Sequence, residues 1–263
     1  MGAKAARLTS AESRLPAIEW EDWDRGKLGP VPLTRAMARG LRPDALAPAR
    51  TPSAESWKIN RPGIAWCDST RQLVECESGL EMLVVHQLDF EGGLLSIATQ
   101  PFRLHMAVSA IGESSVVRHV PDFFVTMADG SRVVIDVHRV YRPAGERSRE
   151  VFDATGGLCD AIGWKYRLIT EPSGHYRQNL LFISGYRARP PHAEQVLTTA
   201  VTVLAAGPMA WRTLVDAVAL SSGVHAALVL PCFFHGILVR MLKVPMEQPF
   251  SAAMPVSSAE GAV

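Results

Sequence analysis

Two apolar runs on either side of a short polar turn form the clearest pattern in the chain. Residues 118–127 and 131–138 are rich in β-branched and aromatic side chains, and Ala-Asp-Gly at 128–130 separates them. Runs of this kind around a Gly-containing turn predict a β-hairpin. Each arm carries one carboxylate in an otherwise apolar segment, Asp122 in the first and Asp136 in the second. An unpaired carboxylate away from water is costly, so a bound divalent cation is an attractive partner for both.

The length of the turn decides whether the two acids meet. If residues 128–130 form a three-residue loop, a type I turn closed by a Gly in the left-handed conformation, then Asp122 faces Asp136. His138 lies two residues beyond Asp136 and points to the same side of the strand. A two-residue Asp-Gly turn would shift the register by one residue and turn Asp122 to the opposite face. The hypothesis of a shared site therefore depends on the longer loop.

Hydrophobic periodicity outside the hairpin predicts an α/β domain. The order helix, three strands, helix, strand is typical of such a domain with a mixed central sheet. Gly163 is predicted to cap the second helix. The predicted elements are a helix over 72–88, strands within 94–108 broken at Gln100-Pro101, a loop over 112–115, the hairpin, a helix over 148–162, and short strands over 166–170 and 180–183.

Composition shifts divide the chain into four predicted parts. The first is rich in Ala, Arg, Pro and Glu, which favours an extended, partly disordered arm with one short helix over 33–39, either mobile or used to bind a partner or DNA. An Arg- and Pro-rich stretch at 187–191 marks the main boundary. The predicted parts are an arm over 1–60, an α/β domain over 61–187, a small helical domain over 188–256 and a disordered tail over 257–263.

The helical domain shows three helical patterns separated by Gly, Pro and Ser. They cover 192–206, 210–220 and 224–242, and the Pro-rich stretch 243–256 is compatible with a short β wing. Three short helices with a wing resemble a winged-helix module. Such modules place a helix in a DNA groove or dock a protein partner, and both uses stay open here.

Bulk properties narrow the class of protein. The 263 residues are 48% hydrophobic, which allows one generous domain or two small ones, and a net charge of +1 gives no overall field for nucleic acid. The four cysteines have no paired spacing, which argues against a zinc ribbon or a disulfide framework. The amino terminus lacks an apolar signal-type core, and no uninterrupted apolar run is long enough to span a bilayer. We therefore expect a soluble cytoplasmic protein that does not contact membranes.

Four short motifs together resemble a known nuclease superfamily. They are Ser78-Gly79-Leu80-Glu81, Gln100-Pro101, His119-Val120-Pro121-Asp122-Phe123-Phe124 and Val134-Ile135-Asp136-Val137-His138. In this order they resemble the PD-(D/E)xK superfamily, and within it the TnsA-type endonuclease subunit of heteromeric transposases. The resemblance covers about residues 72–183, and the carboxyl-terminal helices are similar to that family's helical domain. It implies a restriction-endonuclease-like α/β core followed by a small winged-helix-like domain.

The resemblance also implies roles for particular residues. Glu81, Asp122 and Asp136 fall on metal-binding positions, with Mg²⁺ as the expected cofactor and Mn²⁺ as the alternative, and His138 falls on the position of the family's lysine. These four are the candidate catalytic residues. The implied activity is cleavage of double-stranded DNA at transposon 5′ ends, together with a separate transposase that cuts and joins the 3′ ends and with an ATPase regulator.

Histidine in place of lysine is a departure from the family. Lysine is a compact cation suited to orienting water and stabilising phosphate charge, whereas a histidine side chain, with a reference pKa of about 6.5, is mostly neutral at pH 7. His138 would instead act as a general base or position water. Two alternatives stay open: a catalytically impaired DNA-binding or assembly subunit that retains the nuclease fold, and a stand-alone nuclease. We expect Gln100 and His119 to satisfy backbone groups near the site rather than to bind the metal.

Overall fold

The computed structural model describes residues 16–50, 62–110, 113–139 and 145–259. Over these residues the protein is a mixed α/β structure with seven α-helices and four separate sheets. It divides into two compact units, the first holding the chain up to residue 85 together with 92–171, the second holding 86–91 and the chain from 172 onward. The division after 171 lies ahead of the predicted boundary at 187–191.

A four-stranded mixed sheet forms the centre of the first unit. The strand order is β11-β10-β9-β6, with β10 parallel to β11 and the other neighbours antiparallel. Parallel neighbours need a long crossover, and α3 supplies it. The predicted α/β class and mixed sheet are confirmed, whereas the chain order differs from the predicted α-β-β-β-α-β because β7 and β8 of another sheet lie between β6 and β9. The elements are α2 (Gly79–Glu91), β6 (Leu94–Thr99), β9 (Phe123–Met127), β10 (Arg132–His138), α3 (Glu146–Ile162) and β11 (Lys165–Thr170).

The turn between β9 and β10 has the predicted three residues. Phe123 pairs with Ile135, and the Met127 amide donates to the Ser131 carbonyl at 2.9 Å. Gly130 closes the turn in the left-handed region, with φ of 78°. The same register extended beyond the strand sets residue 122 opposite residue 136, so the geometric condition for a shared site is met.

A second sheet corrects the prediction for the amino-terminal part. Its order is β2-β1-β7-β8, with β3 paired to β1. Residues 16–50 are therefore not an extended arm, although α1 (Arg35–Gly40) occupies the place of the predicted short helix. Residues 1–15 and 51–60 of the predicted arm lie outside the described residues. The strands are β1 (Ala17–Asp22), β2 (Gly26–Pro32), β3 (Leu46–Ala47), β7 (Phe102–Ala110) and β8 (Glu113–His119).

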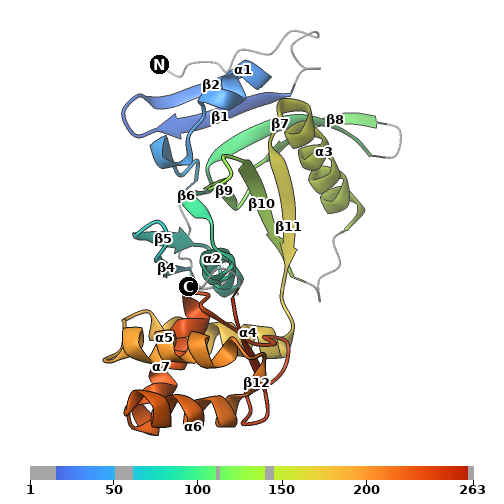
Figure 1. The fold of residues 1–263 in the computed structure, drawn as a ribbon. Coiled ribbons are helices and arrows are strands. Elements are labelled where there is room, and N and C mark those ends of the chain that lie inside the picture. Colours follow the sequence, from blue (N-terminus) through green and yellow to red (C-terminus); the bar gives the residue numbers. More distant parts are fainter. Residues whose placement is uncertain (1–15, 51–61, 111–112, 140–144, 260–263) are drawn as a thin grey trace. The chain divides into compact units, whose positions relative to one another are not determined.

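The core explains why this segment folds onto the domain. Ile18 of β1 is completely buried, and Leu33 and Leu41 join the same apolar cluster. α3 packs against β7 of one sheet and β11 of the other (Figure 1). Three aromatic rings meet in the cluster: Phe124 lies 5.3 Å from Phe102 and 4.6 Å from Trp164 between ring centroids. The free energy gained by burying these apolar side chains outweighs the tendency of residues 16–50 to form turns.

Two further local predictions are wrong in the first unit. Residues 72–76 form β5, which pairs with β4 (Gly63–Cys67), so the helix begins seven residues later than predicted. Val74 and Cys76 are buried and their neighbours are exposed, which is the two-residue period of a strand. Glu113 to Ser115 belong to β8 rather than to a loop. Gly163, by contrast, caps α3 as predicted, with φ of 87°.

The second unit contains the three predicted helices and a small sheet. β14 pairs with both β12 and β13, so the predicted wing is confirmed as a sheet, and it includes Ser257 and Ser258 from the predicted tail. The predicted strand at 180–183 is wrong, because these residues end α4, whose amino terminus is capped by Ser173. The elements are α4 (Gly174–Ile183), α5 (Ala193–Leu204), α6 (Trp211–Ser222), α7 (Ala226–Leu238), β12 (Met209–Ala210), β13 (Leu242–Lys243) and β14 (Pro255–Ser258).

The helix α7 is unusually apolar. It contains no Asp, Glu, Lys or Arg, and Val229, Cys232 and Phe233 on its inner side are buried. Over the described residues no single helix is both long and apolar enough to cross a membrane. Taken together α6 and α7 would meet that criterion by length and composition, but they are bent by 115°.

Candidate active site

Asp122 lies immediately before β9, where Pro121 ends the regular ladder because proline has no amide hydrogen. The Asp122 amide donates to the Ile135 carbonyl at 3.1 Å, and its carbonyl accepts from the Gln100 amide at 2.9 Å. The Val137 amide donates to the Asp122 carboxylate at 2.7 Å. The backbone of β10 and the residue after β6 therefore fix Asp122 between these two strands.

Asp136 lies within β10 and is 2% exposed. Its carboxylate is held from two sides: His119 Nε2 lies 2.9 Å from Oδ2 and 3.0 Å from Oδ1, and the Tyr166 hydroxyl donates to Oδ2 at 2.8 Å. His119 ends β8 and Tyr166 belongs to β11, so two other strands converge on this side chain. The contacts from His119 and Tyr166 therefore offset part of the free-energy cost of burying the Asp136 carboxylate.

Glu81 lies in the first turn of α2 and is 7% exposed. Its carboxylate accepts from the Ser78 hydroxyl at 2.8 Å and from the Glu77 amide at 2.7 Å, while its own amide donates to Ser78 Oγ at 3.2 Å. This arrangement resembles a capping box, with the amide of Glu77 in place of that of Ser78, and it satisfies amide groups left free at the helix start. The acid therefore has a structural role in addition to any chemical one.

Electrostatic coupling joins the three carboxyl groups. Burial, together with the charges of Glu81 and Asp136, raises the pKa of Asp122 to about 8, against the lowering effect of the Val137 amide. Burial also raises the pKa of Glu81, while the hydrogen bonds from Glu77 and Ser78 lower it. Like charges that disfavour one another's ionisation create a site where a cation is stabilising.

Several groups around the acids were not foreseen from the sequence. Burial raises the pKa of Cys159 to about 12, with the charge of Asp136 adding to it. Burial and the same charge raise the pKa of Tyr166, and burial with the charges of Glu81 and Asp122 raises that of Cys76. These groups remain protonated at neutral pH, so Tyr166 is a permanent hydrogen-bond donor. Tyr166 could have been found in the sequence by its place on β11, the strand that runs parallel to β10.

Two imidazoles flank one aromatic ring of α3. The ring of His138, at the end of β10, lies edge-on to Phe152 with centroids 5.8 Å apart, and His119 lies 6.4 Å from the same ring. His119 contacts the carboxylate of Asp136, so the expectation that its side chain would satisfy a backbone group is wrong. Gln100 contacts Asp122 through its backbone. The structure thus gathers Glu81, Asp122 and Asp136 into one electrostatic cluster and sets His138 beside Phe152.

The donor set suits a hard cation, although the side chains are oriented toward protein partners. Among the described residues no group of three or more His, Cys, Asp and Glu side chains is arranged to hold a metal ion. Carboxylate oxygens are nevertheless the ligands that Mg²⁺ prefers. An ionised carboxylate has about four lone-pair sites, so hydrogen bonding to one or two donors leaves it able to coordinate. The three carboxylates are thus the ligand type that Mg²⁺ prefers, but the structure does not arrange them as a metal site.

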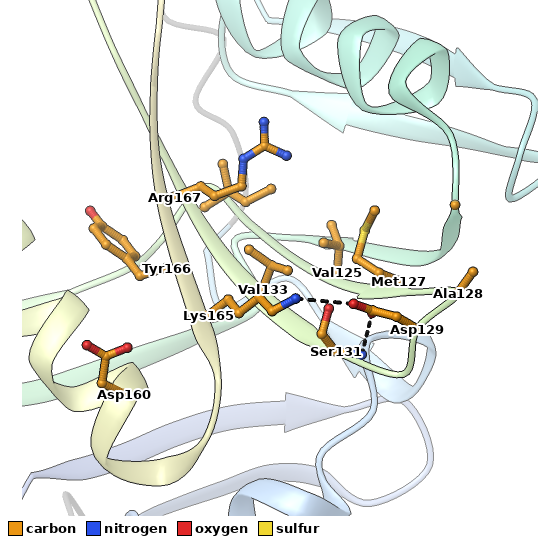
Figure 2. A pocket seen from close by; sticks show the side chains of 12 residues that line it. Val125, Met127, Ala128, Asp129, Ser131, Val133, Asp160, Lys165, Tyr166 and Arg167 are labelled. Carbon is orange, nitrogen blue, oxygen red and sulfur yellow. Dashed lines mark hydrogen bonds and ion pairs between the residues drawn. The ribbon is translucent and has the colours of Figure 1, made fainter. Parts of the chain in front are cut away.

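A surface pocket of about 610 Å³ lies at the turn end of the same sheet. Figure 2 shows the interaction between two of its lining residues, Lys165 and Asp129, with Nζ 3.2 Å from Oδ2. Val133 and Ile135 of β10 line it, and these point to the face opposite that of Asp136. None of the four candidate residues is among the described residues that line this pocket, so it is separate from the carboxyl cluster.

Comparison with known proteins adds no family assignment. No protein-family model and no curated protein matches this chain. Functional inference therefore rests on the side chains described above.

Proposed function

We propose that this chain is a divalent-metal-dependent DNA endonuclease that acts as a subunit of a transposase. The observation that carries the proposal is the coupling of three acids from α2, the start of β9 and the middle of β10. The pKa of Asp122 is raised to about 8 by burial and by the charges of Glu81 and Asp136. A protein that needed these positions only for packing would place apolar side chains there.

The arrangement of elements supports a restriction-endonuclease-like core. The acids occupy the first turn of the helix that precedes the sheet and two adjacent antiparallel strands, in the order of the motifs that resemble the PD-(D/E)xK superfamily. The α-β-β-β-α-β order of α2, β6, β9, β10, α3 and β11 fits that core, with β7 and β8 inserted between its first two strands.

In the proposed reaction each residue has a distinct task. Glu81, Asp122 and Asp136 would hold Mg²⁺ or Mn²⁺ by carboxylate oxygens. When bound, the cation supplies charge stabilisation at the phosphate and acidifies water. Tyr166 fixes the Asp136 carboxylate through its hydroxyl. His138, on the same strand, positions the attacking water or accepts its proton.

Exposed arginines on the elements that carry His119 and Phe152 favour a phosphate-bearing substrate. Arg118 precedes His119 on β8, and Arg147 and Arg149 lie in the first turns of α3, the helix that carries Phe152. Such side chains neutralise DNA phosphates without reading sequence. We take the substrate to be double-stranded DNA at transposon ends and the partners to be a separate transposase and an ATPase regulator. The four cysteines are buried free thiols, which suits the reducing cytoplasm that we propose as its location.

The proposal is tested by cleavage of a supercoiled plasmid bearing transposon ends, with Mg²⁺ or Mn²⁺ and the partner transposase. Wild-type protein is expected to nick it, and Asp122→Ala and Asp136→Ala should lose at least about a hundredfold in rate, as expected when a ligand of a catalytic cation is removed. Asp129→Ala, an exposed acid in the turn of the same hairpin, is the matched control and should cleave normally. Equal nicking by all four proteins would refute the assignment.

Two observations favour a second function. The carboxylates are oriented to protein partners rather than around a common point, and histidine replaces the family's lysine at 138. Both features suit a DNA-binding or assembly subunit that retains the nuclease fold without cutting. The two functions are separated by His138→Lys: a wild-type protein that does not cleave, with a variant that gains metal-dependent cleavage, would favour the second.

A further inference from the structure

The hairpin of β4 and β5 has an apolar outer face. Trp66 lies opposite Leu73 on this face, and both side chains are exposed. Ile64, also exposed, lies opposite Glu75 on the same face. An antiparallel hairpin that buries one face normally presents polar side chains to water on the other. Here large apolar side chains occupy three of these four outer positions, which the burial of the inner face does not explain.

Trp23 extends this apolar face beyond the hairpin. It lies in the turn between β1 and β2 and is 68% exposed, close to the 66% of Leu73. Trp23 and Leu73 line one cavity of about 250 Å³, so the two side chains belong to one continuous surface. The Gln72 side chain holds β5 beside β6 by donating to the Ile97 carbonyl at 2.9 Å. We call this the tryptophan surface, and it consists of Trp23, Ile64, Trp66 and Leu73.

Such a surface has the composition of a protein-binding site. Contiguous exposed apolar side chains mark places where a soluble protein meets another molecule. Tryptophan is also enriched among the few residues that supply most of the binding energy in protein–protein contacts. Two tryptophans on one surface therefore indicate a contact with a partner rather than a chance exposure of single side chains.

The charges beside the tryptophan surface are negative. Asp44 and Glu75 line the cavity, and its described lining residues include no Lys, Arg or His. Arg42 pairs with Asp44, whereas Glu75 forms no ion pair with any residue that the structure describes. A further carboxylate, that of Asp68, accepts from the Trp66 indole at 3.3 Å. The surface thus combines apolar contact area with uncompensated negative charge.

This charge distinguishes between the molecules that could cover the surface. Phosphates of DNA would be repelled by the carboxylates, because nucleic-acid contacts require positive side chains. A second copy of the chain, joined through the same surface, would bring two acidic surfaces together, and like charges across an interface disfavour association. A protein segment with apolar and basic side chains satisfies both features of the surface.

We propose that the tryptophan surface docks a segment of a partner protein that carries large apolar side chains flanked by Lys or Arg. The apolar side chains of the partner cover Trp23, Trp66 and Leu73, and a basic side chain beside them pairs with Glu75. This inference goes beyond the proposed function. It involves none of the candidate active-site residues and requires no metal ion.

The test is to select a phage library of random peptides on the full chain. We expect the enriched peptides to combine Leu, Phe or Trp with Lys or Arg. One enriched peptide is then synthesised, labelled and titrated by fluorescence anisotropy. It should bind Leu73→Asp and Trp23→Asp at least about tenfold less tightly than wild type, the loss expected when a central apolar residue of a contact is replaced. Glu75→Lys should weaken binding by at least about tenfold too, because it replaces an attraction with a repulsion.

The matched control is Leu220→Asp, which makes the same change at an exposed leucine of α6 and should bind the peptide as wild type does. If Leu73→Asp does not fold, Trp23→Asp provides the comparison at a turn. Enriched peptides without basic residues, no enrichment, or unchanged affinity in the folded variants would overturn the inference. Light scattering and binding of a short DNA duplex complete the test. A dimer of the wild type that Leu73→Asp abolishes would assign the surface to a second copy, and duplex binding that Leu73→Asp weakens would assign it to nucleic acid. None of these results depends on cleavage, so the proposed function stands or falls separately.

Discussion

His119 Nε2 lies within 3.0 Å of both carboxylate oxygens of Asp136, so a residue of one sheet holds an acid of the other. His119 ends β8, whereas Asp136 lies in β10. The contact ties the second sheet to the proposed chemistry, because the orientation of a ligating carboxylate depends on the groups that hydrogen-bond to it.

Removal of the imidazole should therefore weaken metal binding without unfolding the domain. We expect His119→Ala to bind Mn²⁺ about 10- to 100-fold less tightly, with His119→Gln restoring part of the affinity because its amide can donate to the same carboxylate. Calorimetric titration of each variant measures the effect. His175→Ala, an exposed histidine of α4, is the control and should behave as wild type. Equal affinity in all variants would show that His119 does not orient a ligand.

Tyr166 should contribute mainly to stability. Its hydroxyl donates to the buried carboxylate of Asp136 at 2.8 Å, and Tyr166→Phe leaves that acceptor with one partner fewer. The expected loss is about 1–3 kcal/mol in the free energy of unfolding. Urea titration followed by circular dichroism gives this value at pH 7. Tyr176→Phe on α4 makes the same chemical change outside the cluster and should shift the midpoint little; an equal shift would contradict the assigned role.

The two roles of Glu81 can be separated. Ser78→Ala removes the cap of α2 and should destabilise the protein by about 0.5–2 kcal/mol while leaving the acid for catalysis. Glu81→Gln keeps a carbonyl acceptor for the cap and removes the charge, so it should retain stability but lose cleavage. Thermal melts and plasmid nicking on both proteins test the separation. The opposite pattern, an active Glu81→Gln, would mean that this residue only caps the helix.

The raised pKa of Asp122 predicts a pH-dependent stability in metal-free buffer. Its folded value of about 8 lies above the ordinary 3.8, so between these values the folded protein binds more protons than the unfolded chain. Stability must then fall as pH rises through this window. Asp122→Asn should flatten the profile and exceed wild-type stability at pH 8 by more than about 1 kcal/mol, since one pKa unit corresponds to about 1.4 kcal/mol.

Asp129→Asn is the control for this experiment. Hydrogen bonds from Ser131, with help from Lys165, lower the pKa of this exposed carboxyl to about 2. Its contribution to stability is present above 3.8 and is lost only as pH falls toward 2, outside the window of Asp122. Denaturant melts from pH 4 to pH 9 in the presence of a chelator distinguish the two. A wild-type profile that rises with pH across this range would contradict the predicted coupling.

Local patterns predicted those features that local interactions decide. The turn at 128–130, the register that sets Asp122 opposite Asp136, and α3 with its cap at Gly163 all follow from residues near one another in sequence. The short apolar run at 180–183 was predicted as a strand, but it ends a helix that is capped at Ser173, and periodicity does not separate the two in so short a run.

Pairing between strands that lie far apart in the chain could not be predicted from local sequence patterns. Ile18 pairs with Leu104 across more than eighty residues, and nothing near Ile18 in sequence signals that partner. The candidate site shows the same restriction. The apolar neighbours of Asp136 in sequence indicated that its carboxylate would be costly to bury. The residues that contact this carboxylate lie on other strands, so local sequence did not indicate them. The spacing of Ser78 and Glu81, three residues apart, is the local sequence signal for the role of Glu81 at the start of the helix. The family resemblance indicated a metal-binding role for the same carboxylate.

The composition of α7 has a consequence for how the second unit is used. A helix that reads bases in the major groove needs side chains with hydrogen-bond donors and acceptors on its outer face. The exposed positions of α7 are Ala227, Leu228 and Leu230, which carry none. The exposed side chains of this helix therefore offer no hydrogen bonds to base edges. Its outer surface resembles the apolar centre of a protein–protein contact, so we expect any recognition of DNA sequence to come from other elements of the chain.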